Sequence, residues 1–412
     1  MSVHEIARRG AGTWSGKVVH PLAPLIFRGC RAALAGLERG SVRLTLPSGH
    51  TAVFRGKAPG VQAAIVVRNQ GVFWKSLRRG GIGFAESYMN GDWTTPDLGA
   101  VLRFFLQNRS GLTRGDNTWF RARLPDRLFH RLRRNTRRGS RRNIAYHYDL
   151  GNAFYARWLD ASMMYSSAYF THDGQSLEAA QRAKSDLILD MLEVAPGERM
   201  LEIGCGWGGF ALHAARERGM RVHGITLSPA QLALASQKAR EAGLDERCTF
   251  QLLDYRDVGG TYDRLASIEM VEAVGADGWP TYFRSLRERL KPGGVAVIQA
   301  ITIDEALFDR YRRRPDFIQR YIFPGGMLPT VEGIRAHAAE TGLAVESELR
   351  FGPSYARTLR EWRRRFLESW PAIRHDGFDK RFRRMWSYYL TYCEVGFDWG
   401  TIDVGLYKLR RP

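Results

Sequence analysis

The chain has 412 residues, 44% of them hydrophobic and 25% charged, and a formal net charge of +20. This composition excludes a disordered protein and is typical of a soluble globular protein large enough for two domains. No apolar run is long enough to cross a bilayer, and the N-terminus lacks the apolar core of a secretory signal. The four cysteines are scattered without a CxxC pair, so we expect no metal site, no disulfide framework and a cytoplasmic location.

The first third of the chain predicts a small mixed domain. Residues 41–56 alternate apolar and polar positions around a Pro-Ser-Gly turn, which indicates a hairpin. A second extended run follows at 63–69, and residues 98–108 have helical spacing. We therefore expect a smaller N-terminal α+β domain over residues 1–120.

Residues 121–142 carry ten arginines and connect this domain to the rest of the chain. Leu124, Leu128 and Leu132 recur every four residues, as in a basic amphipathic helix that docks on an anionic membrane surface. A solvated linker is the alternative. The net positive charge would also attract nucleic acid, but the sequence contains no recognisable RNA- or DNA-binding module, so we expect no nucleic-acid partner.

Residues 143–412 alternate helices and strands, which predicts a doubly wound, Rossmann-like α/β domain. A helix over 176–194 has Leu177, Ala180, Lys184, Leu187 and Met191 on one side. The later alternation over 400–409 suits an edge strand. The other predicted strands are 200–204, 221–227, 249–254, 263–269 and 295–301, and the other predicted helices are 210–219 and 229–243.

The stretch LEIGCGWGG at 201–209 contains a Gly-x-Gly-x-x-Gly pattern at Gly204, Gly206 and Gly209. A strand, a glycine loop and a helix in this order bring backbone N–H groups to an anion at a helix N-terminus. NAD, S-adenosylmethionine (SAM) and a plain tight turn are the three interpretations. The acidic residue that a dinucleotide fold places about 20 residues on is missing, which counts against NAD.

Further residues favour SAM. Glu202 precedes the first glycine, where a carboxylate can face the cationic methionine end of SAM. Asp254 and Tyr255 end the third strand, where an acid can accept from the adenine amino group and a ring can stack on the base. Gln231 lies at position N3 of a helix that starts at Ser228. It either caps that helix or contacts the ribose, and the sequence leaves both roles open.

Longer motifs carry a family resemblance. YHYDLGNAFYARWLD (146–160), MYSSAYF (164–170), EIGCGWGGFALHAA (202–215), GITLSPAQ (224–231), YIFPGG (321–326) and SYARTLREW (354–362) together resemble the cyclopropane-fatty-acyl-phospholipid synthase and fatty-acid C-methyltransferase family. FAESYMNGDW (84–93) resembles the N-terminal domain of its phospholipid-acting members. The resemblance implies a class I methyltransferase domain over 143–412.

The resemblance also implies an activity and a location. SAM would methylate the cis double bond of an acyl chain in a membrane phospholipid, at the inner face of the cell membrane, and the protein would form a homodimer. The positions that match SAM contacts in the family are Tyr165, Ser166, Gly204, Gly206, Thr226, Leu227, Gln231 and Tyr255.

Family members remove the final proton with a bound bicarbonate. By resemblance Glu272, Tyr355 and Ile301 match three of the groups that hold it. Ser167 replaces the usual Cys, and Gln299 replaces the usual His. A neutral amide lacks the positive charge that an imidazolium would offer to bicarbonate. Either the anion site persists in weaker form, or Glu272 or Glu269 takes the proton directly.

The product is expected to depend on this base. The combination of EMVEAVG with QAIT resembles the branch-forming members, so we favour a methylene or methyl branch over a cyclopropane ring. A methyltransferase of a soluble small molecule is a second possible enzyme. Aromatic rings can stabilise a carbocation, and those within family motifs are expected to line the acyl tunnel. They are Tyr146, Tyr148, Phe154, Tyr165, Tyr169, Phe170 and Tyr355.

Overall fold

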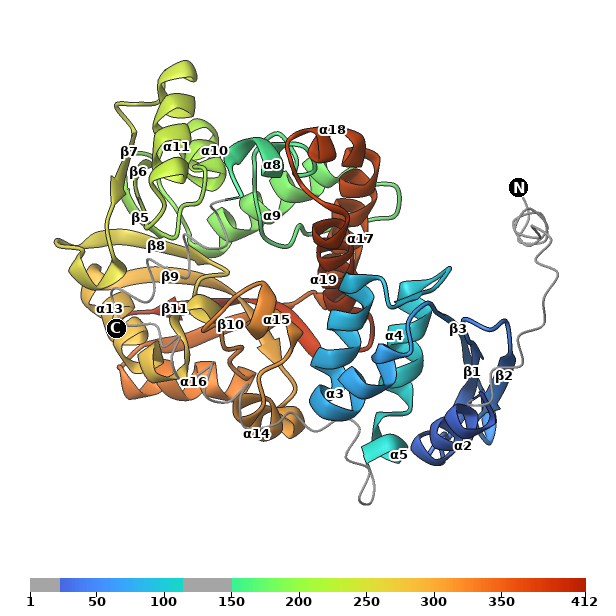
Figure 1. The fold of residues 1–412 in the computed structure, drawn as a ribbon. Helices are drawn as coiled ribbons and strands as arrows, with labels where there is room; N and C mark the ends of the chain where they lie inside the picture. Colours follow the sequence, from blue (N-terminus) through green and yellow to red (C-terminus); the bar gives the residue numbers. More distant parts are fainter. Residues whose placement is uncertain (1–22, 114–149) are drawn as a thin grey trace.

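The computed structural model describes residues 23–113 and 150–412, which form two units (Figure 1). The arginine-rich stretch 121–142, Tyr146 and Tyr148 lie outside the described residues. The N-terminal unit is α+β and the larger unit is α/β, as the sequence predicts.

The N-terminal unit contains a four-stranded sheet in the order β2-β1-β3-β4. β1 (Arg39–Thr45) and β2 (Thr51–Arg55) pair antiparallel, which confirms the predicted hairpin. β3 (Ala58–Val67) pairs parallel to β1 and is longer than the predicted run, and β4 (Trp93–Thr94) closes the sheet.

Four helices accompany this sheet: α2 (Ala23–Ala33), α3 (Gly71–Asn90), α4 (Leu98–Gln107) and α5 (Arg109–Thr113). The Asp97 side chain caps α4 by accepting from the Ala100 N–H at 2.9 Å. The predicted helix over 98–108 is thus confirmed. The sequence did not predict α3, which is interrupted at Gly80, where φ is +57°.

The large unit is built on a seven-stranded sheet in the order β10-β11-β9-β8-β5-β6-β7. In this sheet β11 runs antiparallel to both of its neighbours, β9 and β10, and the other strand pairs described are parallel. The strands are β5 (Arg199–Ile203), β6 (Arg221–Thr226), β7 (Cys248–Leu252), β8 (Tyr262–Ile268), β9 (Leu290–Ile303), β10 (Ala344–Arg350) and β11 (Ile402–Arg410).

The expectation that residues 400–409 form an edge strand is wrong. β11 lies between β9 and β10, with hydrogen-bonded partners on both sides. Its polar residues are accommodated because they are paired: Asp403 accepts from the Gly352 N–H at 2.8 Å, and Lys408 forms ion pairs with Glu193 and Glu346. The outer strand β10 is rich in charged residues, as edge strands commonly are.

Helices cover both faces of this sheet. Alternate strand residues face opposite sides: Met200 packs in the layer that contains α9 and α10, and Leu201 in the layer that contains α13 and α16. The helices are α8 (Asn152–Ala156), α9 (Leu177–Met191), α10 (Gly209–Arg218), α11 (Pro229–Glu241), α12 (Val271–Val274), α13 (Trp279–Arg289), α14 (Glu305–Arg313), α15 (Phe317–Tyr321), α16 (Val331–Glu340), α17 (Gly352–Glu368), α18 (Trp370–His375) and α19 (Lys380–Asp398).

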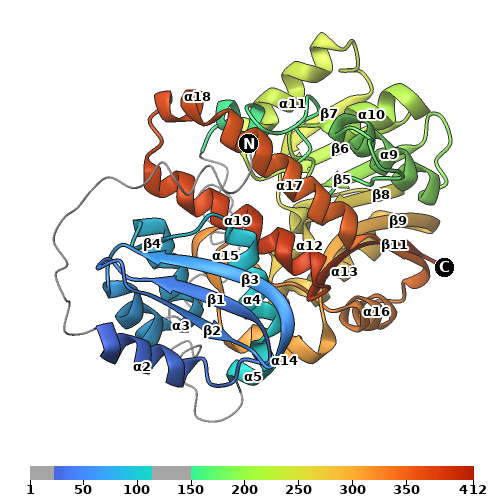
Figure 2. The same cartoon turned by 90° about the vertical axis from the view of Figure 1, so that its right-hand side faces the viewer.

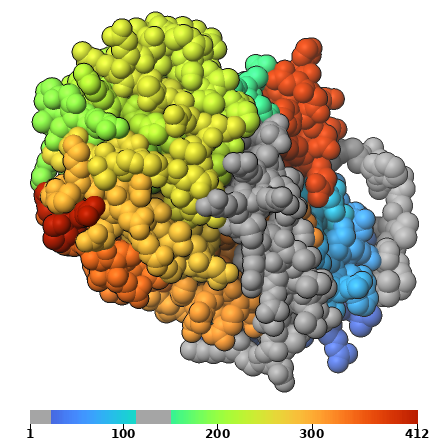
Figure 3. Space-filling model, turned by 90° about the vertical axis from the view of Figure 1, so that its left-hand side faces the viewer, coloured from blue at the N-terminus to red at the C-terminus, as the bar shows by residue number. Residues whose placement is uncertain are grey.

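α19 joins the two units. It packs against α17 of the large unit and against α3 and α4 of the N-terminal unit, and Figure 2 shows it between them. The Arg384 guanidinium donates to the backbone carbonyls of Tyr88 and Trp93 at 3.1 and 3.3 Å. On the opposite side of the large unit, the segment with α11 lies above the one with α14 and α16, and the end of β11 reaches the surface (Figure 3).

Candidate active site

A cavity of about 670 Å³ lies at the carboxyl ends of β5, β6 and β8. Ile203, Thr226 and Glu269 line it where these strands end. Helices α17 and α19 contribute Tyr355 and Tyr389. Ligands of open α/β sheets bind at this edge, where the strand order reverses around β5.

The glycine loop forms one wall of the cavity. Gly204, Gly206 and Gly208 have φ of +83°, +52° and +81°, a region that favours glycine. A Cβ on Gly206 would meet no protein atom within 4 Å, whereas one on Gly209 would lie 2.6 Å from the Ser162 carbonyl oxygen. The loop therefore presents open backbone to the cavity at Gly206 and packs closely on residue 162 at Gly209.

The next wall is formed at the end of β6. The Ser228 side chain accepts from the Gln231 N–H at 3.3 Å and caps α11, as the sequence predicts. The Gln231 side chain does not cap: its Oε1 accepts from the Thr226 hydroxyl at 2.7 Å. Gln231, Thr226 and Leu227 all line the cavity, so the amide NH2 of Gln231 remains to contact a ligand.

Asp254 and Tyr255, which were both expected to contact adenine, lie in different surroundings. Tyr255 lines the cavity, and burial raises the pKa of its hydroxyl to about 12. The structure does not bring Asp254 to the cavity wall. Its carboxylate instead accepts from the Arg256 backbone N–H and guanidinium at 2.5–3.1 Å, because the short helix 255–257 turns Arg256 back onto it.

Charged groups are buried beside the glycine loop. Glu202 and Lys184 both line the cavity, and burial raises the pKa of Glu202 and lowers that of Lys184. Lys184 Nζ donates to Ser166 Oγ at 2.8 Å, and the Gln181 amide donates to the Ser166 carbonyl. Oε2 of Glu202 is buried without a partner. Such an oxygen is costly to bury alone and fits a cationic or N–H-donating ligand.

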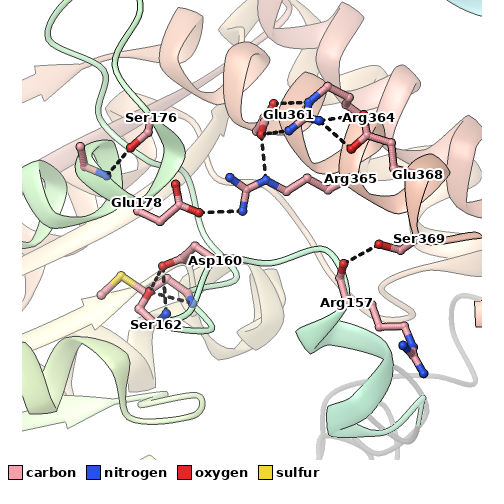
Figure 4. Close-up of polar contacts among 12 residues, drawn as sticks. Arg157, Asp160, Ser162, Ser176, Glu178, Glu361, Arg364, Arg365, Glu368 and Ser369 are labelled. Atoms are coloured by element: carbon pink, nitrogen blue, oxygen red, sulfur yellow. Dashed lines mark hydrogen bonds and ion pairs between the residues drawn. The ribbon is translucent and has the colours of Figure 1, made fainter. Parts of the chain in front are cut away.

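Several polar contacts hold the elements around this site (Figure 4). Asp160 accepts from the backbone N–H and hydroxyl of Ser162 at 3.0 and 2.5 Å, which fixes the turn against which Gly209 packs. Arg365 on α17 forms an ion pair with Glu178 on α9 at 2.8 Å. The helices that carry Tyr355 and Lys184 are therefore tied to each other.

Two partly buried carboxylates, Glu269 and Glu272, follow the end of β8. Glu269 accepts from the Ser167 N–H at 2.8 Å, the Gln299 amide at 2.7 Å and the Tyr355 hydroxyl at 2.6 Å. Glu272 accepts from the Ile301 N–H at 2.5 Å, and its second oxygen is buried without a partner.

The two carboxylates differ in environment. Burial, followed by the nearby charge of Glu269, raises the pKa of Glu272 to about 8. Burial also raises the pKa of Glu269, but its three hydrogen bonds and the charge of Lys184 oppose that rise. Glu272 is thus the neutral partner near pH 7, and Glu269 is the better stabilised anion.

Aromatic side chains surround the rest of the cavity, but not all of those expected. Tyr165 and Tyr355 line it, and the Tyr165 hydroxyl lies 2.8 Å from that of Tyr389. Phe154 packs in the core, and Tyr169 and Phe170 are absent from the wall. The wall instead contains rings that the sequence did not single out. They are Phe84, Phe105, Tyr311, Phe317, Phe323, Tyr388, Tyr389, Tyr392 and Phe397.

The cavity is also lined by residues that the sequence did not predict to line it. Ile82, Phe84 and Leu102 come from the N-terminal unit, which thus forms part of the wall. Lys184 was expected only on a helix face, although a lysine among the apolar residues of that face was a usable signal. Within residues 23–113 and 150–412, no group of His, Cys, Asp and Glu could hold a metal ion. None of the helices described is long and apolar enough to span a membrane.

Comparisons with known proteins show which proteins this chain resembles. A family model described as mycolic acid cyclopropane synthetase matches residues 135–406. Tuberculostearic acid methyltransferase UfaA1 of Mycobacterium tuberculosis is 42% identical over 349 residues, covering 81% of this chain and 80% of the relative. Cyclopropane-fatty-acyl-phospholipid synthase of Escherichia coli is 38% identical over 348 residues, covering 83% and 85%.

Solved structures are similar as well. The cyclopropane synthase MmaA2 from M. tuberculosis is 31% identical with a TM-score of 0.62, over 66% of this chain and 98% of that one. The mycolic acid cyclopropane synthase CmaA1 in complex with SAH and CTAB is 29% identical, with the same TM-score and coverage.

Proposed function

Because this chain belongs to the mycolic acid cyclopropane synthetase family of SAM-dependent enzymes, we propose that it methylates the double bond of an unsaturated acyl chain in a membrane phospholipid. The single observation that carries this proposal is the continuity of one cavity, in which the glycine loop, the two carboxylates and an apolar aromatic wall meet. The mixture provides a polar site for SAM beside an apolar site for an acyl chain.

The residues at the glycine loop fit SAM. The unpartnered oxygen of Glu202 would accept from the ammonium of the methionine part, and the Gln231 amide would donate to the ribose. Tyr255 would stack beside the adenine. When bound, SAM supplies an electrophilic methyl group on a sulfonium.

The apolar wall orients the alkene and excludes water. An alkene is a weak nucleophile, so alignment against the methyl carbon must supply much of the rate. The π electron pair of the alkene would form the new C–C bond to the methyl group that SAM supplies, and the S–CH3 bond pair would remain on sulfur. The adjacent carbon of the acyl chain becomes a cation, which the faces of Tyr165, Phe323 and Tyr389 stabilise at about 0.5–2 kcal/mol per ring.

Loss of a proton completes the reaction. A hydride shift from the methyl-bearing carbon moves the cation onto that carbon, and removal of a proton from the new methyl group gives an exocyclic methylene. Proton removal before the shift closes a cyclopropane instead. Three hydrogen bonds lower the basicity of Glu269, which gives the hydride time to move, so we favour the methylene branch. The 42% identity to a protein named a methyltransferase supports the same choice.

A cluster of arginines supports a phospholipid substrate. Arg109, Arg310 and Arg314 line the cavity, and the Arg109 and Arg314 charges help burial to lower the pKa of Arg310. Arg310 is partly desolvated by its surroundings but keeps exposed surface, so this basic end of the cavity faces solvent. A lipid phosphate at this end would relieve the mutual repulsion while its acyl chain enters the apolar part. The enzyme would then act while docked peripherally on a membrane, at the inner face of the cell membrane.

The test is an assay of the purified full chain with SAM and vesicles of phosphatidylglycerol that carry cis-monounsaturated acyl chains. We expect SAM turnover together with acyl chains that have gained one CH2. Vesicles of fully saturated phosphatidylglycerol are the control and should give no turnover. Equal turnover with saturated vesicles, or turnover only with a soluble acceptor, would contradict the proposal.

A further inference from the structure

The groups expected to hold bicarbonate are engaged by a side chain of the protein itself. The Ser167 N–H, the Gln299 amide and the Tyr355 hydroxyl all donate to the Glu269 carboxylate, at 2.8, 2.7 and 2.6 Å. A carboxylate and a bicarbonate present similar planar pairs of anionic oxygens. Glu269 therefore uses the donors that an anion in this place would need.

The backbone shows that this placement has a cost. Glu269 has φ of +51°, a conformation that glycine adopts readily and other residues rarely do. Such strain costs of order 1–3 kcal/mol and persists where surrounding contacts hold it. Here the Glu269 N–H also donates to the Gln299 carbonyl at 2.8 Å, so main chain and side chain are both fixed to the same residue.

We propose that Glu269 is a built-in anion that replaces bicarbonate and acts as the catalytic general base of this enzyme. Glu269 lines the cavity beside Tyr165 and Tyr355, so its carboxylate reaches the space assigned to the acyl chain. This inference rests on the proposed methyl transfer, because it assigns the base for that reaction.

Bicarbonate does not fit beside Glu269. A second anion would face the Glu269 carboxylate and the buried carboxyl of Glu272 while three donors remain occupied. A bicarbonate and the Glu269 carboxylate would be two negative charges in one poorly solvated site, where like charges repel strongly. The buried cation whose charge lowers the pKa of Glu269 is Lys184, and its Nζ already donates to Ser166 Oγ.

The step balances without a further reactant. Glu269 takes one proton from the transferred methyl group after the hydride shift, and the C–H bond pair becomes the π bond of the exocyclic methylene. The acyl chain becomes neutral and Glu269 becomes a neutral acid. The Tyr355 hydroxyl and the Gln299 amide hold the carboxylate in position, and the proton leaves to solvent before the next turnover.

The experiment compares wild type, Glu269→Gly and Glu269→Gln in CO2-depleted buffer with and without added bicarbonate. Glycine suits the backbone at this position, so Glu269→Gly empties the site without strain, and its thermal midpoint verifies folding. Glu269→Gln keeps the site filled but is not a base. Binding of ¹³C-labelled bicarbonate, followed by NMR, provides a readout that does not depend on activity.

We expect wild-type turnover to be the same with and without bicarbonate. Glu269→Gly should lose about 100-fold in turnover, regain much of it with bicarbonate and bind the labelled ion. Glu269→Gln should lose as much and not be rescued. A wild type that needs or binds bicarbonate, or a Glu269→Gly variant of full activity in depleted buffer, would overturn the inference. If wild type modifies no acyl chain, the proposed function fails, and labelled bicarbonate binding still tests the site.

Discussion

The Tyr355 hydroxyl lies 2.6 Å from Oε2 of Glu269, although the two residues are 86 positions apart. Tyr355 is on α17, and Glu269 follows the last residue of β8. The hydrogen bond joins the edge of the sheet to α17 at the wall of the cavity. It also makes Tyr355 a positioning residue for Glu269, since the hydrogen bond favours the charged form of the carboxylate.

Tyr355→Phe should move the acid limb of the kcat–pH profile to higher pH. Loss of the donor raises the pKa of Glu269, so a larger share of the enzyme has a protonated base at a given pH. A hydrogen bond to a charged group is worth about 1.5–3 kcal/mol, which corresponds to a shift of about one to two pH units. Tyr262→Phe, whose hydroxyl bonds His223 away from the cavity, is the control and should leave the profile unchanged. An unshifted Tyr355→Phe profile would show that the two groups are not coupled in turnover.

Gly206→Ala should weaken SAM binding. Gly206 and Gly243 both have positive φ, +52° and +64°, and a Cβ on either meets no protein atom within 4 Å. Both alanine variants should lose about 1 kcal/mol of stability, or about 2–4 °C in thermal midpoint. Only the Gly206 methyl group would enter the cavity, so its Kd for S-adenosylhomocysteine should rise about tenfold or more in calorimetric titration. Equal affinities of the two variants would place the ligand elsewhere.

Glu202→Gln should also reduce cofactor affinity, for an electrostatic reason. Burial raises the pKa of Glu202 to about 8, and the ammonium of a bound ligand would favour its charged form. The substitution removes that carboxylate, and a charge-assisted hydrogen bond lost in this way costs about tenfold or more in Kd. Calorimetry with S-adenosylhomocysteine measures the loss. Glu241→Gln, at an exposed site on α11, provides the same chemical change away from the cavity. A Kd that does not differ between these two variants would remove Glu202 from the binding site.

Glu272→Gln should make stability less dependent on pH. In the folded protein Glu272 keeps its proton up to about pH 8, whereas in the unfolded chain it loses it near the ordinary pKa of 4.5. The folded state therefore holds more protons between these values, and wild-type stability falls as pH rises through this window. Glutamine cannot ionise, so the thermal midpoint of Glu272→Gln relative to wild type should increase from pH 5 to pH 8 by about 2 °C or more. Parallel midpoints across this range would mean that Glu272 is ionised in the folded protein.

Arg137→Glu with Arg138→Glu should weaken binding to vesicles rich in phosphatidylglycerol. Each basic residue near an anionic surface contributes about 1 kcal/mol, so reversal of two charges should cost at least about 30-fold in affinity. Arg221→Glu with Arg240→Glu changes the same net charge at exposed positions on β6 and α11. Vesicle co-sedimentation at two salt concentrations measures both. Equal losses in the two double variants would assign the effect to net charge and not to the segment 121–142.

The sequence predicted the order of strands and helices in the large unit because their apolar periodicity is regular. It predicted α9 as 176–194, and the observed helix is Leu177–Met191. It failed for β11, since alternation cannot distinguish an edge strand from an inner strand whose polar residues are paired. It also missed α3, whose glycines at 80, 81 and 83 lower helix propensity, and Gly80 does interrupt the helix with φ of +57°.

For the candidate site, motif positions identified the glycine loop and the Glu272, Gln299 and Tyr355 set. The sequence could not predict that these donors bind Glu269, because this arrangement depends on the left-handed backbone conformation of Glu269. That single torsion turns the carboxylate toward Ser167, Gln299 and Tyr355. The part played by the N-terminal unit could not be predicted either, since it follows from the packing of α3 and α4 on α19.

The order of hydride shift and proton loss is tested most directly by the structure of the lipid formed from SAM with a ¹³C-labelled methyl group and cis-monounsaturated phosphatidylglycerol. NMR of the extracted acyl chains identifies the labelled carbon. We expect an exocyclic methylene, with the label in a vinylic CH2. A labelled cyclopropane carbon with upfield ring protons would contradict the assigned order of hydride shift and proton loss. Label in no acyl chain would contradict the proposed function itself.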